Sequence, residues 1–111
     1  MSDEPVDLTN FRELTDGDEE MERELFQEFI SSAREAIGTL EQNCQDGEND
    51  MWRGAAHALK GTSLSLGAES LSQICKEGQD GHAAKAGEKS RILAEIKSEY
   101  ERVETFLSPY L

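Results

Sequence analysis

One histidine and three near neighbours are the residues best placed for chemistry. His57 is followed by Lys60, Gly61 and Leu64. At 100° per residue, with the apolar stripe of this segment centred on Trp52, His57 lies at about 140° and the other three lie beside it on the outward side. Imidazole, with a reference pKa of about 6.5, is largely neutral at pH 7, so an exposed ring can take a phosphoryl group on nitrogen without a separate base.

Taken singly, each of these residues would be an ordinary surface residue. A functional role is favoured because all four residues share one face of the same segment. This segment, 51–66, contains no acid, although the chain has 24 Asp and Glu against 11 Lys and Arg and a net charge of −13. Lys60 would balance the charge of a bound phosphoryl group. Gly61, which costs a helix roughly 1 kcal/mol relative to Ala, would leave room for a partner protein, and Leu64 would belong to an apolar docking patch.

A neutral hydrogen-bonding group can be placed near His57 by counting along the chain. Gly67 and Ala68 read as a tight turn, so the segments on either side should run back to back. His57 lies ten residues before Gly67 and Gln79 lies twelve residues after it, about 15 and 18 Å from the turn along a helix. The Gln79 amide would then bond phosphoryl oxygens or orient the ring.

Other chemistries lack their motifs. Neither His has a Glu three residues before it, as di-iron bundles require, and the two His and two Cys have no zinc-site spacing, so no metal is expected. Hydrolase and nucleotide-binding signatures are absent. Cys44 and Cys75 both fall in apolar phase and are expected to be buried, inert thiols in a reducing compartment. His82, in a Gly-rich stretch, reads as an ordinary exposed residue.

The composition of the chain excludes some classes of binding partner and some cellular locations. A chain of 111 residues makes one domain, and its strong negative charge argues against binding nucleic acid or an anionic membrane. No apolar run is long enough to span a bilayer, and the acidic start does not resemble a signal peptide. We expect a cytoplasmic monomer. Residues 1–24 hold ten acids and two bases, or −8 of the total charge.

Apolar residues recur at helical spacing, and no segment alternates as a strand does. A short helix is indicated around Leu8, Phe11 and Leu14. The stripe of a long second helix comprises Met21, Leu25, Phe29, Ile30, Ala33, Ala36, Ile37, Leu40 and Cys44. The stripe of the third comprises Trp52, Ala55, Ala56, Leu59, Ser63 and Leu66. The fourth uses Leu71, Ile74 and Cys75 and runs to about Gln79, and the last uses Ile92, Leu93, Ile96, Tyr100, Val103, Phe106 and Leu107.

These helices predict an all-α fold. Four substantial helices with short connections most simply form an up-down-up-down four-helix bundle over residues 8–111, with the short N-terminal helix covering one end and residues 1–7 forming an acidic tail. Thr15 or Asp16 is expected to cap the second helix, Asn49 or Asp50 the third, and Gly67 to end the third.

The segment His57-Ala58-Leu59-Lys60-Gly61-Thr62-Ser63-Leu64-Ser65-Leu66-Gly67-Ala68, followed by Leu71 and Cys75, resembles the signature of histidine-containing phosphotransfer (HPt) domains. The resemblance covers roughly residues 8–107 and is richest in motifs over 52–79. It implies a phosphorelay intermediate, not an enzyme with turnover of its own. His57 would exchange a phosphoryl group with the aspartate of a receiver domain in a response regulator or hybrid kinase.

The resemblance also implies roles for the neighbours of His57. Lys60 corresponds to the phosphate-side lysine, Gly61 to the small residue beside the histidine, and Gln79 to a position where some members carry glutamine. Magnesium would belong to the receiver, so this chain needs no cofactor. Gly78 stands where the family often has Leu, which predicts that the fourth helix ends early or frays.

Receiver docking is assigned to Arg53, Leu64 and Lys76. One alternative is an HPt-like adaptor that binds a receiver or kinase without carrying phosphate, although the intact set of His57, Lys60 and Gly61 argues against it. Another is an acidic bundle that binds a basic partner through residues 1–24, but a solvated tail explains those acids more simply. With no kinase core or receiver motif attached, the chain reads as a free-standing relay protein unless it is an excised fragment.

Overall fold

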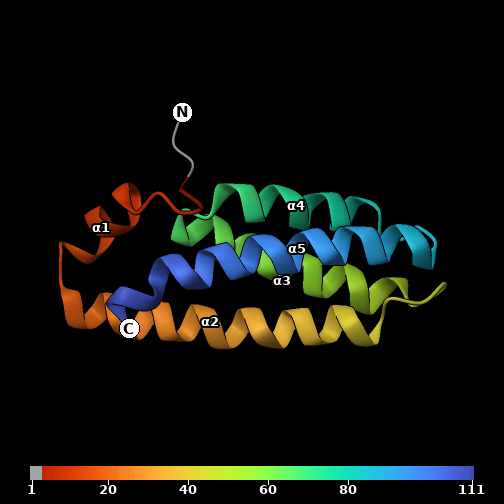
Figure 1. The fold of residues 1–111 in the computed structure, drawn as a ribbon, viewed down its shortest axis with the longest axis horizontal. Coiled ribbons are helices and arrows are strands. Elements are labelled where there is room, and N and C mark those ends of the chain that lie inside the picture. The colour runs from red at the N-terminus through yellow and green to blue at the C-terminus, as the bar shows by residue number, and fades with distance from the viewer. Residues whose placement is uncertain (1–3) are drawn as a thin grey trace.

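The computed structural model describes residues 4–111, and all regular structure in that range is helical (Figure 1). The elements are α1 (Thr9–Thr15), α2 (Glu19–Gln42), α3 (Asn49–Leu66), α4 (Glu69–Asp80), α5 (Ala86–Leu107) and a final 3₁₀ turn (Ser108–Tyr110). The all-α prediction is therefore confirmed.

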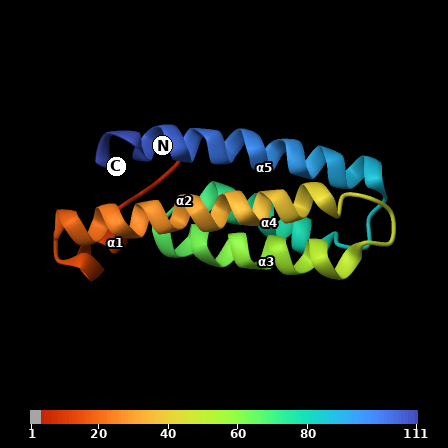
Figure 2. The ribbon, with the colours of Figure 1, turned by 90° about the horizontal axis from the view of Figure 1, so that it is seen from below.

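The four long helices lie side by side in a body of 44 × 28 × 20 Å. In Figure 1 the chain runs from left to right along α2 and α4 and from right to left along α3 and α5. The packed pairs are α2 with α3, α3 with α4, α4 with α5, and α5 with α2. Figure 2 shows α5 on the side of the bundle opposite α3. Each of these helices therefore buries one stripe against two neighbours.

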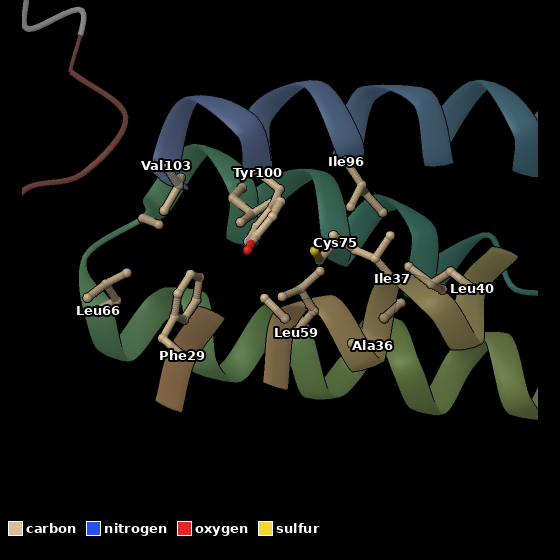
Figure 3. Packing of buried hydrophobic residues seen from close by; sticks show 14 of the residues in the cluster. Phe29, Ala36, Ile37, Leu40, Leu59, Leu66, Cys75, Ile96, Tyr100 and Val103 are labelled. Carbon is tan, nitrogen blue, oxygen red and sulfur yellow. The ribbon is translucent and has the colours of Figure 1, made fainter. Parts of the chain in front are cut away.

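The core fills the space between these helices (Figure 3). All six residues predicted for the α3 stripe are buried. The close-up labels Phe29, Ala36, Ile37 and Leu40 from α2, Leu59 and Leu66 from α3, Cys75 from α4, and Ile96, Tyr100 and Val103 from α5. Burying one face of α3 leaves its opposite face to solvent, and that face carries the candidate site.

The prediction for the start of α2 is wrong by one residue. Met21 and Leu25 are 46% and 39% exposed, whereas Glu22 and Phe26 are buried. The physical reason is α1, whose Phe11 ring stacks on Phe26 with 5.1 Å between ring centroids. A contact between two separate helices decides which residues face inward here, and periodicity within one helix does not contain that information.

The expectations about the N-terminal elements also need correction. Leu14 was expected in the stripe of the short helix but is 83% exposed. The N-cap of α2 is Asp18, whose carboxylate accepts a hydrogen bond from the Met21 amide, and not Thr15 or Asp16. Asp16 instead ends α1 in the left-handed conformation, with φ of 54°.

The start of α3 differs from the prediction in the same way. Neither Asn49 nor Asp50 caps the helix, because α3 begins at Asn49 after Glu48, without a side-chain cap. The Asn49 side chain accepts a hydrogen bond from Lys89 Nζ at 2.9 Å instead. The first residue of α3 is thereby tied to α5.

Gly67 ends α3 as predicted. Its φ of 97° places it in the left-handed region that favours glycine, and a Cβ there would lie 2.0 Å from the Asp7 carbonyl oxygen. The Asp7 amide donates to the Gly67 carbonyl at 3.0 Å, and Val6 beside it is only 2% exposed. The packed part of the chain thus begins by Val6, before the predicted domain boundary at residue 8.

The predicted early end of α4 at Gly78 is wrong. The helix continues to Asp80, and Gly78 is buried where α4 meets α3 and α5. A Cβ on Gly78 would lie 3.3 Å from Ile92 Cγ2 and 3.8 Å from Trp52 Cζ2. The Trp52 indole also donates a hydrogen bond to the Gly78 carbonyl at 2.9 Å. This glycine permits close packing and does not break the helix.

Candidate functional site

α3 carries His57 on its solvent-exposed face. Trp52, Ala56 and Leu59 turn the opposite face of the helix into the core, so His57 is exposed. A Cβ on Gly61, four residues later, would meet no other atom within 4 Å. The imidazole therefore has an open flank on its C-terminal side.

A groove between α2 and α3 lies on one side of His57. It has a volume of about 610 Å³, and His57, Ala58 and Gly61 line it from α3. Phe29 and Ser32 are among the α2 residues in its opposite wall. The surface of this groove is mostly apolar, which suits contact with another protein more than retention of a free ion.

A second hollow, of about 410 Å³, lies on the α4 side of the same histidine. His57, Gln79, Arg53, Gly54 and Asp50 line it. The two residues that the sequence placed at the same level, His57 and Gln79, thus border one space. His57 forms the shared edge of both hollows.

Gln79 is half-buried at the end of α4. Its side-chain Oε1 is buried and has no hydrogen-bond partner within residues 4–111. Its backbone carbonyl lies 3.1 Å from Nδ1 of His82, which is half-buried and not the ordinary exposed residue that the sequence suggested. The chain after α4 is therefore folded back onto the residue that borders the site.

Two cations flank His57 along α3 without being neutralised by a neighbour. Lys60 is half-buried, Arg53 is exposed, and neither makes an ion pair with an acid in the described part of the chain. The Lys60 carbonyl accepts a hydrogen bond from Ser72 Oγ at 3.1 Å, which ties that turn of α3 to α4. The site therefore offers two cations to an anion, although the Asp50 carboxylate also lines the hollow on the α4 side.

The other two residues assigned to docking, Leu64 and Lys76, lie outside the two hollows beside His57. Leu64 is 62% exposed, as an apolar docking residue would have to be. Lys76 is exposed on α4 and its Nζ lies 3.6 Å from a carboxylate oxygen of Asp80. Neither residue lines the two hollows that share His57.

Comparison with known protein families shows to which family the chain belongs. The family model described as the Hpt domain matches residues 24–106, which is most of the chain. The chain is a member of the Hpt domain family. Its family role is phosphotransfer in two-component signalling, and Hpt domains are phosphocarriers without kinase activity of their own. No curated protein and no solved structure matched the chain.

Sequence reasoning undervalued two features of this Hpt domain. Arg53 was assigned only to docking, although its position four residues before His57 places it one helical turn away, in the same hollow. Gly54 was not singled out, and a Cβ on it would meet nothing within 4 Å. The i−4 and i−3 spacings from His57 were the available signals.

The two thiols of the Hpt domain differ. Cys75 is fully buried, and burial raises its pKa to about 12, as expected for an inert thiol. Cys44 is only half-buried, with its Sγ 3.5 Å from Ser90 Oγ, so the prediction of burial is wrong for this residue. Cys44 lies just beyond Asn43, the C-cap of α2, where the α2–α3 loop begins.

Two further properties concern the described residues as a whole. Within residues 4–111, no helix is both long enough and apolar enough to cross a bilayer. In the same range, no group of three or more His, Cys, Asp or Glu side chains is arranged to hold a metal ion.

Proposed function

We propose that this Hpt domain is a phosphorelay intermediate in which His57 carries the phosphoryl group. The observation that supports this proposal is the exposed imidazole, which borders two hollows, has an open flank at Gly61 and lies one helical turn from Lys60, a cation that forms no ion pair in the described part of the chain. The partner would be a receiver domain of a response regulator or hybrid kinase, and the setting would be the cytoplasm, with the carrier a monomer.

The transfer is a displacement at phosphorus. The unprotonated ring nitrogen of His57 attacks the phosphorus of an aspartyl phosphate, a P–N bond forms, and the P–O bond to the receiver aspartate breaks. The aspartate leaves as a carboxylate, and the proton on the other ring nitrogen stays in place. The reverse reaction passes the group to a second receiver. Magnesium would be held by the receiver, and this chain would add no cofactor.

The neighbours of His57 would stabilise the phosphorylated state. Lys60 would offset the negative charge of the phosphoryl group, and the Gln79 amide would hydrogen-bond to its oxygens. Gly61 would let the receiver approach the ring, while Leu64, Arg53 and Lys76 would contribute to the docking surface around it.

Transfer from a labelled receiver tests the proposal. A panel of phosphorylated receivers should give this protein an acid-labile, alkali-stable phosphate. His57→Gln should abolish the label while the helical signal and Tm change little, because the residue is exposed. Label that persists in His57→Gln would refute His57 as the acceptor. Tight receiver binding without any label on the unaltered protein would favour the adaptor alternative.

A further inference from the structure

Trp52 lies beneath the site, one and a half turns before His57 on α3. Its indole is fully buried and donates a hydrogen bond to the Gly78 carbonyl at 2.9 Å. That carbonyl belongs to the last turn of α4, where carbonyls lack an amide partner from the helix itself. The indole N–H therefore completes the end of α4, and its removal would leave a buried acceptor unpaired.

The ring of Trp52 has two close neighbours from other helices. One is the α4 backbone at Gly78, where an added Cβ would lie 3.8 Å from Trp52 Cζ2. The other is the ammonium of the buried Lys89, 5.6 Å from the ring centroid. Lys89 is itself held by hydrogen bonds from Nζ to the Gln45 carbonyl and to Asn49 Oδ1. The indole therefore has little freedom to reorient.

Gln79 follows Gly78 directly and borders the hollow beside His57. The buried end of its amide is Oε1, which has no hydrogen-bond partner within residues 4–111. Nε2 makes no hydrogen bond to the same residues and is the end of the amide that reaches the surface. An amide N–H donor at this edge suits the oxygens of a phosphoryl group.

We propose that the contact between Trp52 and Gly78 positions Gln79 for the phosphoryl group on His57. Trp52 is a positioning residue in this proposal, because it touches neither the ring nor the phosphate. Its N–H fixes the last turn of α4 against α3, and that register sets where the Gln79 amide lies. Without it, Gly78 would allow this turn to unwind, since glycine has the least restricted backbone. The inference rests on the function proposed above.

Trp52→Phe tests the contact in the unphosphorylated protein, because it removes the N–H and retains an aromatic ring. We expect the NMR resonances of the Gln79 side-chain amide and of the His57 ring to shift. Ile96→Val, a core truncation on α5 chosen to match the loss in Tm, should leave both unchanged. Unchanged resonances in Trp52→Phe, or equal shifts in the control, would overturn the proposal whether or not His57 carries phosphate.

A double-mutant cycle tests the consequence for the phosphorylated protein. Trp52→Phe should shorten the half-life of the phosphorylated form about fivefold, as expected for the loss of one hydrogen bond. In a Gln79→Ala background the same change should have no further effect on half-life, although it should still lower Tm. Equal shortening in both backgrounds would show that Trp52 acts only through general stability. If the proposed function itself fails, the unaltered protein takes no label, or His57→Gln keeps it.

Discussion

Gly61 leaves the flank of the His57 imidazole open, since a Cβ there would meet no other atom within 4 Å. The folded state therefore has space for a larger residue, and the helix would gain from one. The glycine in the middle of α3 therefore lowers helix stability, and it keeps the approach to His57 open from outside. A substitution at Gly61 should therefore change the stability of the helix and the access of a partner to His57 in opposite directions.

Gly61→Gln should raise the free energy of unfolding by about 0.7–1 kcal/mol, because glutamine is the better helix former. It should also slow phosphotransfer, because the new side chain obstructs the approach of a receiver to His57. Urea unfolding and the transfer rate measure the two effects.

Gly38→Gln is the matched control for this substitution. Gly38 lies inside α2, has the same open space at its Cβ, and lines neither hollow beside His57. It should stabilise the fold to a similar extent without slowing transfer. Equal transfer rates in the two variants would remove the steric role assigned to Gly61.

The cysteines give a second prediction at this scale. Because burial raises the pKa of Cys75 to about 12, its thiol stays protonated and shielded at pH 8. A thiol reagent should modify Cys44 in the folded protein and reach Cys75 only after denaturation. Cys44→Ser should accordingly show no fast reaction, and one fast thiol in that variant would contradict the buried position of Cys75.

The same pKa shift has a consequence for stability. The folded state retains the Cys75 proton above pH 9, whereas the unfolded chain loses it, so the contribution of this thiol to stability is full below about pH 9 and declines as pH rises toward 12.

At the scale of helices, the packing of α3 on α4 depends on a large residue facing a small one. Trp52 fills the space that Gly78 leaves, and Ile92 of α5 closes it at 3.3 Å from the position of an added Cβ. The hydrogen bond from Trp52 to the Gly78 carbonyl also constrains the orientation of the indole against α4.

Gly78→Leu should lower the free energy of unfolding by about 1–3 kcal/mol, because the new side chain overpacks the contact with Trp52 and Ile92. Trp52→Leu alone should also destabilise, because it leaves a cavity. The double variant should lose less than the sum of the two by at least about 0.5 kcal/mol in urea unfolding. Strict additivity would show that the two residues do not share this space.

The contact between Trp52 and Gly78 is an example of a feature that could not be predicted from the sequence. The burial of one face of α3 follows from spacing within a single segment, and the same spacing leaves His57 on the other face. Gly78 could not be understood in that way, because the residue that explains it lies 26 positions earlier in the chain. The start of α2 was misassigned for the same reason, since Phe11 of α1 selects Phe26 for burial.

The candidate site, like the fold, was predictable only where the information lies within one or two neighbouring helices. Counting along two antiparallel helices brought Gln79 to the level of His57, and both line one hollow. The groove on the α2 side was not predictable, because its walls come from helices whose relative rotation the sequence does not specify. The roles of His57, Lys60 and Gln79 in transfer remain predictions for the experiments above.

At the scale of the whole molecule, charge is the dominant long-range feature. The net charge of −13 causes self-repulsion in the compact state, whereas the ion pairs of residues 4–111 mostly join exposed side chains. Exposed pairs contribute little each, about 0–1 kcal/mol, so the repulsion should outweigh them.

Sodium chloride should therefore raise Tm between low ionic strength and about 0.5 M, because screening weakens the repulsion more than it weakens the pairs. Differential scanning calorimetry measures the effect. Glu24→Gln removes an exposed carboxylate that forms no ion pair within residues 4–111, and it should raise Tm at low salt, with the gain vanishing at high salt. A Tm that falls as salt is added would show that the ion pairs dominate.

Trp52 is also the only tryptophan in the chain. Its fluorescence therefore comes from a single known place, an apolar contact one residue from Gln79 and on the same helix as His57. An unlabelled sample thus contains a built-in optical probe of this junction, and receiver binding or phosphate loading can be followed in a stopped-flow instrument through its emission, without attaching a dye.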